Sequence, residues 1–150
     1  AVSEIFTNGP SSVTAAYYNT KKSMFMLFHG NQVWKYNFNL ISGRVDLAPG
    51  YPTRLPVDGN WHTGAAMYSQ PERILVSFDK TVGFYNEERH SLNVRGPISK
   101  VYPNMPEGVA GFADIGPGQH VGFTESSVFT YNWKTHVVEH IGSPSSLLNC

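Results

Sequence analysis

The chain has 150 residues, and its 11 basic and 11 acidic side chains give a formal net charge of zero. Because charges of both signs are interspersed, the composition argues against nucleic-acid and membrane partners. No apolar run approaches the roughly 20 residues of a membrane-spanning helix. The 14 glycines, the 10 prolines and the lack of helical periodicity predict an all-β chain of short strands.

The first residues match a later stretch of the same chain. Val2 to Pro10 aligns without a gap with Ile98 to Pro106, which lies near the end of an internal repeat. We therefore expect residues 1–12 to be either the tail of a preceding repeat or a closing strand beside the last one.

The remainder consists of three repeats, 13–62, 63–108 and 109–150, which make residues 1–150 a single repeat domain. Each repeat begins with small residues, continues with an apolar strand and a polar turn, and reaches a strand with a Tyr-Asn pair. The pairs, 49 and 46 residues apart, are Tyr36-Asn37, Tyr85-Asn86 and Tyr131-Asn132. This spacing is typical of propeller blades. We predict three sheets, each with one pair near the end of its third strand, and three buried tyrosines.

This order of elements resembles hemopexin-like repeats. The third strand reads Val33-Trp34-Lys35-Tyr36, and residues 47–55 are similar to the Gly-Tyr-Pro ending of such repeats. The resemblance implies β-propeller blades, each a four-stranded antiparallel sheet, that serve extracellular recognition and not catalysis. The family has four repeats and this chain has three, so a β-trefoil stays open as the alternative fold.

The resemblance also implies a cation such as calcium in the central channel, held largely by backbone carbonyls of the inner strands. The corresponding residues here are Thr14, Gly64 and Ala110, where the family usually carries Asp. We expect this metal site to be weakened.

The single cysteine, Cys150, has no partner in the chain. The family joins the first and last blades by a disulfide, and an odd Cys in an extracellular protein suggests an intermolecular bridge or a lost partner segment. An unpaired thiol at a frayed terminus is the plain alternative. Three blades also leave an open side that exposes Ile5 and Phe6. We expect a homo-oligomer or an additional blade segment linked through Cys150.

Two tryptophans depart from the repeat pattern. Trp61 lies in a loop between Asn60 and His62, and Trp133 follows the last Tyr-Asn pair and precedes Lys134. Aromatic rings beside polar neighbours suit stacking on sugar rings or anchoring a protein partner. The alternative is that both rings cap the core at the ends of blades.

Catalytic constellations are scarce. His136 and His140 have the spacing of a zinc pair, but the Val-Val run between them favours exposed histidines on a strand. Glu87 and Glu88 are interpreted as part of a solvated turn, and no His-Glu-x-x-His motif is present. We expect a secreted, non-catalytic recognition module for protein or glycan ligands. The alternatives are an oligomeric carbohydrate-binding lectin of three repeats and a haem or metal carrier, which rests on the six histidines.

Overall fold

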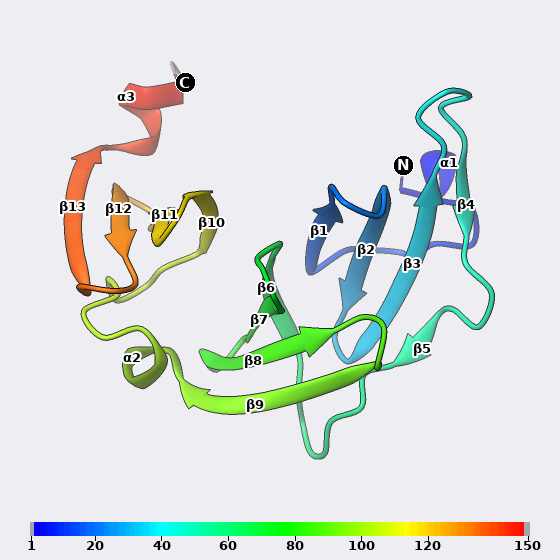
Figure 1. Ribbon diagram of the computed structural model, residues 1–150, viewed down its shortest axis with the longest axis horizontal. Coiled ribbons are helices and arrows are strands. Elements are labelled where there is room, and N and C mark those ends of the chain that lie inside the picture. Colours follow the sequence, from blue (N-terminus) through cyan, green and yellow to red (C-terminus); the bar gives the residue numbers. More distant parts are fainter. Residues whose placement is uncertain (1, 149–150) are drawn as a thin grey trace.

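The computed structural model describes residues 2–148, whose strands form three separate antiparallel sheets (Figure 1). The first sheet contains β1 (Ala15–Asn19), β2 (Met24–His29), β3 (Gln32–Phe38), β4 (Val45–Leu47) and the short β5 (Thr53–Arg54). The second contains β6 (Thr63–Met67), β7 (Arg73–Ser77), β8 (Thr81–Asn86) and β9 (Ser91–Pro97). The third contains β10 (Gly111–Gly116), β11 (Gln119–Phe123), β12 (Val128–Asn132) and β13 (Val137–Gly142).

The described helices are single turns. They are α1 (Val2–Ile5), α2 (Ile98–Val101) and α3 (Pro144–Leu148). Among residues 2–148, no helix is long and apolar enough to span a membrane. The chain is all-β as predicted. Its four strands per repeat pair in sequence order within separate sheets, with β5 as an extra strand on β3, so these are propeller blades and the trefoil alternative is wrong.

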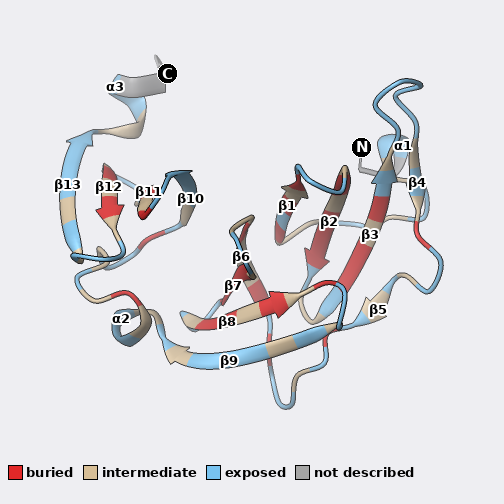
Figure 2. Cartoon of the chain, in the orientation of Figure 1, coloured by how far each residue is buried: buried red, intermediate tan, exposed pale blue. Residues whose placement is uncertain are grey.

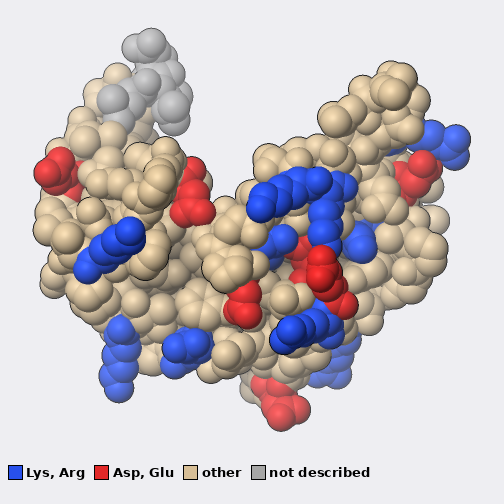
Figure 3. Space-filling view, in the orientation of Figure 1, with Lys and Arg blue, Asp and Glu red and all other residues tan. Residues whose placement is uncertain are grey.

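The three sheets follow one another around an open arc, with the inner strands β1, β6 and β10 turned toward its centre (Figure 1). Strand β6 lies beside both β1 and β10. The arc is open between the third and first sheets, where the space-filling surface is deeply hollowed (Figure 3). Acidic and basic side chains are mixed on the face that Figure 3 shows, in agreement with the balanced composition.

The core lies between neighbouring sheets. Buried residues concentrate in the middle strands, and the outermost strands β9 and β13 are largely exposed (Figure 2). Strand β7 is buried along its whole length because it has a sheet on each face. Leu75 packs in the cluster shared with the first sheet, and Ile74 and Val76 pack in the cluster shared with the third. This alternation follows from the two-residue period of a strand.

The predicted tyrosines are confirmed as core residues. Tyr36, Tyr85 and Tyr131 are each 0% exposed and lie at or near the end of the third strand of their sheets. Each hydroxyl also has a partner, since a phenol that is buried needs one. Tyr36 donates to the carbonyl of Thr7 over 2.9 Å and Tyr131 to that of Pro103 over 2.7 Å. The Tyr85 hydroxyl lies 3.0 Å from a ring nitrogen of His90.

Residues 2–12 form no strand, so the closing-strand alternative is wrong. They form α1 and a turn that lie against the first sheet, and Phe6 packs edge-on against Tyr36 with ring centroids 5.0 Å apart. In the same way α2 leads to Tyr102, which packs edge-on against Tyr131 at 6.0 Å. The aligned segments therefore take equivalent places on two blades. Ile5 is 63% exposed as expected, whereas Phe6 is half-buried.

The buried tyrosines predict a loss of stability in alkali. Burial is the first cause that raises the pKa of Tyr17, Tyr85 and Tyr102 above the ordinary value of 10.0, well above it for Tyr17. The folded state therefore holds these protons more tightly, and the unfolded state loses them first as the pH rises. The urea midpoint should fall steadily above about pH 10. Equal midpoints at about pH 9 and about pH 11 would contradict this expectation.

Candidate functional site

Trp61 does not form part of a ligand site. It is 6% exposed in the cluster between the first and second sheets, and its indole N–H donates to Thr63 Oγ1 over 2.9 Å. Its ring covers Gly83, where a Cβ would lie 3.3 Å from the ring. Gly83 stands two residues before Tyr85, at the position that Trp34 and Phe129 hold in the other blades. Trp61 thus supplies the aromatic ring that this position of β8 lacks. The prediction of a stacking role for Trp61 is wrong.

The other predicted residues divide between two places. Asn60 and His62 are exposed beside the buried Trp61, at the entrance to β6. Trp133 and Lys134 are exposed in the turn between β12 and β13, in the third sheet. The structure therefore does not bring the five residues together as one site, and only the Trp133 end borders a sizeable cavity.

This cavity, the Trp133 pocket, lies between the second and third sheets and has a volume of about 460 Å³. The loop from β6 to β7 contributes polar residues and β8 an aromatic ring. The opposite wall comes from β10, β11, the turn between them and the β12–β13 turn. The residues that give it chemical character are Gln70, Glu72, Phe84, Asp114, His120 and Trp133. Trp133 is 45% exposed at its edge, so one part of the indole is open to a ligand.

The turn that carries Trp133 is held firmly. Asn132 Oδ1 accepts the backbone N–H groups of Lys134 and Thr135 over 2.9 and 3.0 Å, an Asx turn that fixes the chain after the Tyr-Asn pair. The Trp133 N–H donates to the Gly118 carbonyl in the β10–β11 turn. This bond is made by the backbone N–H of Trp133, so it ties the β12–β13 turn to the β10–β11 turn and holds the backbone from which the indole projects.

A buried histidine lies against the carboxylate of Asp114. His120 is 2% exposed, and its Nδ1 lies 2.6 Å from Asp114 Oδ1, close but poorly aligned for a hydrogen bond. Burial lowers the pKa of His120 below its ordinary value, and the nearby Asp114 opposes this shift only in part. At neutral pH the imidazole is uncharged, so Asp114 keeps a net negative charge at the pocket.

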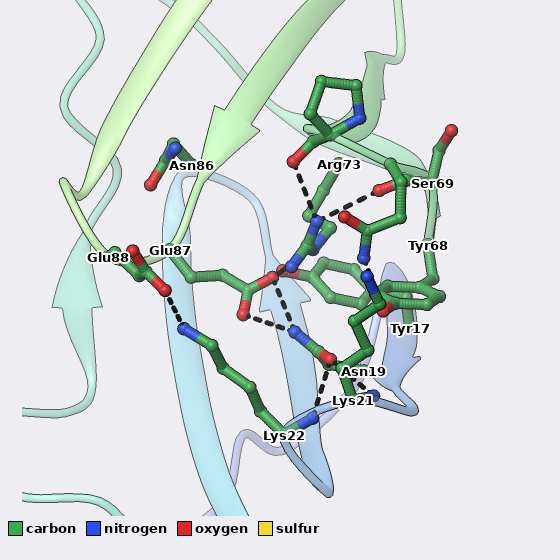
Figure 4. A network of polar contacts seen from close by, with 12 residues as sticks. Tyr17, Asn19, Lys21, Lys22, Tyr68, Ser69, Arg73, Asn86, Glu87 and Glu88 are labelled. Carbon is green, nitrogen blue, oxygen red and sulfur yellow. Dashed lines mark hydrogen bonds and ion pairs between the residues drawn. The ribbon is translucent and has the colours of Figure 1, made fainter.

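A second polar cluster joins the first and second sheets (Figure 4). Glu87 is 7% exposed and accepts hydrogen bonds from Tyr17 and Asn19, while the buried Arg73 forms an ion pair with the same carboxylate. Arg73 also donates to the backbone carbonyls of the β6–β7 loop and lies 4.8 Å from the Tyr68 ring centroid. The interpretation of Glu87 as a solvated residue is therefore wrong. Because its hydrogen-bonding capacity is used within the protein, we interpret this cluster as an interblade clamp.

The channel at the centre of the arc has few side-chain oxygens that could bind a cation. Gly64 and Ala110 border a hollow of about 740 Å³ whose lining is apolar, and the Thr14 hydroxyl donates to the Phe28 carbonyl. Calcium usually takes six to eight oxygens, carboxylates among them. In the described part of the chain, no group of three or more His, Cys, Asp or Glu is placed to hold a metal. The side chains fit a cation poorly, and backbone binding at these three positions stays a prediction.

Two further expectations concern residues near the end of the chain. His136 lies in the turn before β13 and His140 lies within β13, with Nδ1 2.7 Å from Ser127 Oγ. Cys150 lies outside the described residues, so the predicted interchain disulfide stays a prediction.

Comparisons with known proteins identify the fold. No family model matches the chain. The chain is 29% identical over its whole length to "Matrix metalloproteinase-C" of Caenorhabditis elegans and spans 26% of that protein. The hemopexin fold protein CP4 from cow pea superposes with a TM-score of 0.70 at 13% identity, over 97% of this chain and 76% of that one. A lectin with two metal binding sites from Cicer arietinum superposes with a TM-score of 0.69 at 12% identity, over 91% and 70%.

These likenesses confirm the resemblance to hemopexin-like repeats. The three sheets have the fold of hemopexin-type propeller blades. Because the identities to the solved structures are low, these likenesses show the fold alone.

Proposed function

We propose that the chain is a non-catalytic, extracellular recognition module that binds a glycan or protein ligand at the Trp133 pocket. The observation that carries the proposal is the half-exposed indole beside a mixed polar and apolar cavity of small-molecule size. The Caenorhabditis elegans relative is named as a metalloproteinase, but this chain contains no His-Glu-x-x-His motif. A role in recognition beside a separate catalytic domain is consistent with the 26% of that relative that the chain spans.

A glycan array probed with the protein and with Trp133→Ala tests this function. Glycans that bind the parent protein should not bind Trp133→Ala, because the variant removes the exposed indole of the pocket. A parallel haem titration tests the carrier alternative. Saturable haem binding without glycan binding would replace the proposal with haem carriage.

The second candidate function, a lectin completed by oligomerisation, is favoured by the open side of the arc. Phe123 and Ile141 of the third sheet are 49% and 50% exposed where they line the central hollow. The first sheet carries segment 2–12 where the third carries α2 and its following turn. A further four-stranded blade would cover the open faces of the third and first sheets. Its outer strand would lead into segment 2–12, as β9 leads into α2. We propose that such a blade closes the arc, supplied by a second copy or by an additional segment.

The mass of the native protein distinguishes these sources. Sedimentation should show two chains, or one chain with an additional polypeptide, because exposed apolar sheet faces favour association. Repeating the run under reducing conditions shows whether Cys150 contributes to the link. A stable, folded monomer of 16.7 kDa with no additional polypeptide would contradict closure by another blade.

A further inference from the structure

The lining of the Trp133 pocket accepts hydrogen bonds more readily than it donates them. Glu72 and Asp114 contribute carboxylates, and no described residue of the lining is Lys or Arg. Gln70 uses one amide N–H to donate to the Tyr68 hydroxyl over 2.6 Å, so its carbonyl oxygen and its second N–H are left for a ligand. These acceptors suit a ligand that presents several hydroxyl donors. They disfavour an anion, which would meet two negative charges.

The aromatic rings of the pocket carry positive charges of their own. Lys134 Nζ lies 5.6 Å from the Trp133 ring centroid, and the Arg95 guanidinium lies 5.5 Å from that of Phe84. Both rings therefore already have a cation against them, which is the place where a cationic ligand would gain most. Lys134 and Arg95 offset the charges of Glu72 and Asp114, so the surroundings of the pocket have no net charge that would favour an ionic ligand over its hydration by water.

An uncharged ligand needs no net charge from the pocket and loses less hydration on binding than an ion does. From this balance we propose that the Trp133 pocket binds an uncharged hexopyranose, alone or at the end of a glycan, an inference that rests on the proposed function. The apolar face of the sugar ring lies on the open part of the indole, and its hydroxyls donate to Glu72, Asp114 and Gln70. The buried His120 lies against the same Asp114 carboxylate.

Matched sugars test the charge preference. Glucose, galactose and mannose are titrated to millimolar concentration, each beside its 2-amino sugar and its uronic acid, with tryptophan fluorescence as the readout. The signal reports on Trp133 because Trp34 and Trp61 are each only 6% exposed. At least one uncharged sugar should bind, about tenfold more tightly than its cationic and anionic counterparts.

Two variants localise the binding. Trp133→Ala should weaken the binding of the uncharged sugar by about tenfold or more. Phe78→Ala, which removes a 62% exposed ring outside the pocket, should bind as the parent does.

If an amino sugar or a uronic acid bound more tightly than its uncharged counterpart, and Trp133→Ala lost that binding, the inference would be overturned. The proposed function would remain intact. Absence of binding for all nine sugars would also overturn it, with a protein ligand left to the module. Binding that survives in Trp133→Ala would overturn both the inference and the location of the proposed function.

Discussion

Replacing Tyr85 by Ala should lower the free energy of unfolding by about 3–5 kcal/mol, the usual cost of deleting a buried aromatic ring. Tyr85 is 0% exposed, and its ring packs edge-on against Phe28 of the neighbouring blade with centroids 6.2 Å apart. The variant therefore leaves a cavity between two sheets that are held together by their side chains. Urea unfolding followed by far-ultraviolet circular dichroism measures the change.

Tyr85→Phe is the matched control, because it keeps the ring and removes only the hydroxyl with its contacts to His90 and Tyr51. Its free energy of unfolding should fall by about 1 kcal/mol, the usual net contribution of one hydrogen bond. If Tyr85→Ala unfolded at the same urea concentration as Tyr85→Phe, the tyrosine rings would not be the packing layers between blades.

Replacing Glu87 by Gln should lower the free energy of unfolding by about 3 kcal/mol, because it leaves the buried Arg73 without its counter-charge. The effect lies at the lower end of the range for broken buried pairs, since Arg73 keeps its bonds to the Ser69 and Pro71 carbonyls. Chemical unfolding of the variant and the parent at neutral pH measures the difference.

The adjacent Glu88 provides the control for charge alone. Glu88 pairs with Lys22 at the surface, where 72% of the Glu88 side chain is exposed. Glu88→Gln removes the same charge and should leave the urea midpoint unchanged, because water screens an exposed pair. Equal losses in Glu87→Gln and Glu88→Gln would show that the interblade clamp adds nothing beyond net charge.

The repeat period predicted three equivalent β units, and the resemblance to hemopexin-like repeats predicted that they are propeller blades. Equivalent positions in equivalent blades share one environment, so Tyr36, Tyr85 and Tyr131 could be assigned to the core from spacing alone. The same logic explains how the α1 segment could be matched to the α2 segment.

Contacts between positions that are not equivalent in the repeats could not be predicted from the repeat pattern. Glu87 accepts hydrogen bonds from Tyr17 and Asn19 of the first sheet, which lie 70 and 68 residues earlier in the chain. Trp61 does lie in a loop, but its burial had a signal in the sequence: Gly83 breaks the aromatic pattern of the third strands, and the Trp61 ring lies over that glycine. A gap in a repeat thus predicts a compensating residue.

The candidate site was predictable only in part. Trp133 stood out as a tryptophan directly after a Tyr-Asn pair, where the first repeat has Phe38 and the second has Glu87. The pair of His120 and Asp114 gave no such sign, because their contact depends on the register of β10 against β11. The loop with Gln70 and Glu72 comes from another blade, and its position depends on how the two sheets pack.

The central claim is that this blade assembly binds its ligand at the Trp133 pocket, and the three indole N–H resonances test it most directly. Trp34 donates to the Asn8 carbonyl and Trp61 to Thr63 Oγ1, so both indoles are buried and hydrogen-bonded. In a nitrogen-15 correlation spectrum, added sugar should move the Trp133 resonance and leave the other two in place. Movement of the Trp34 or Trp61 resonance while that of Trp133 stays fixed would contradict the account.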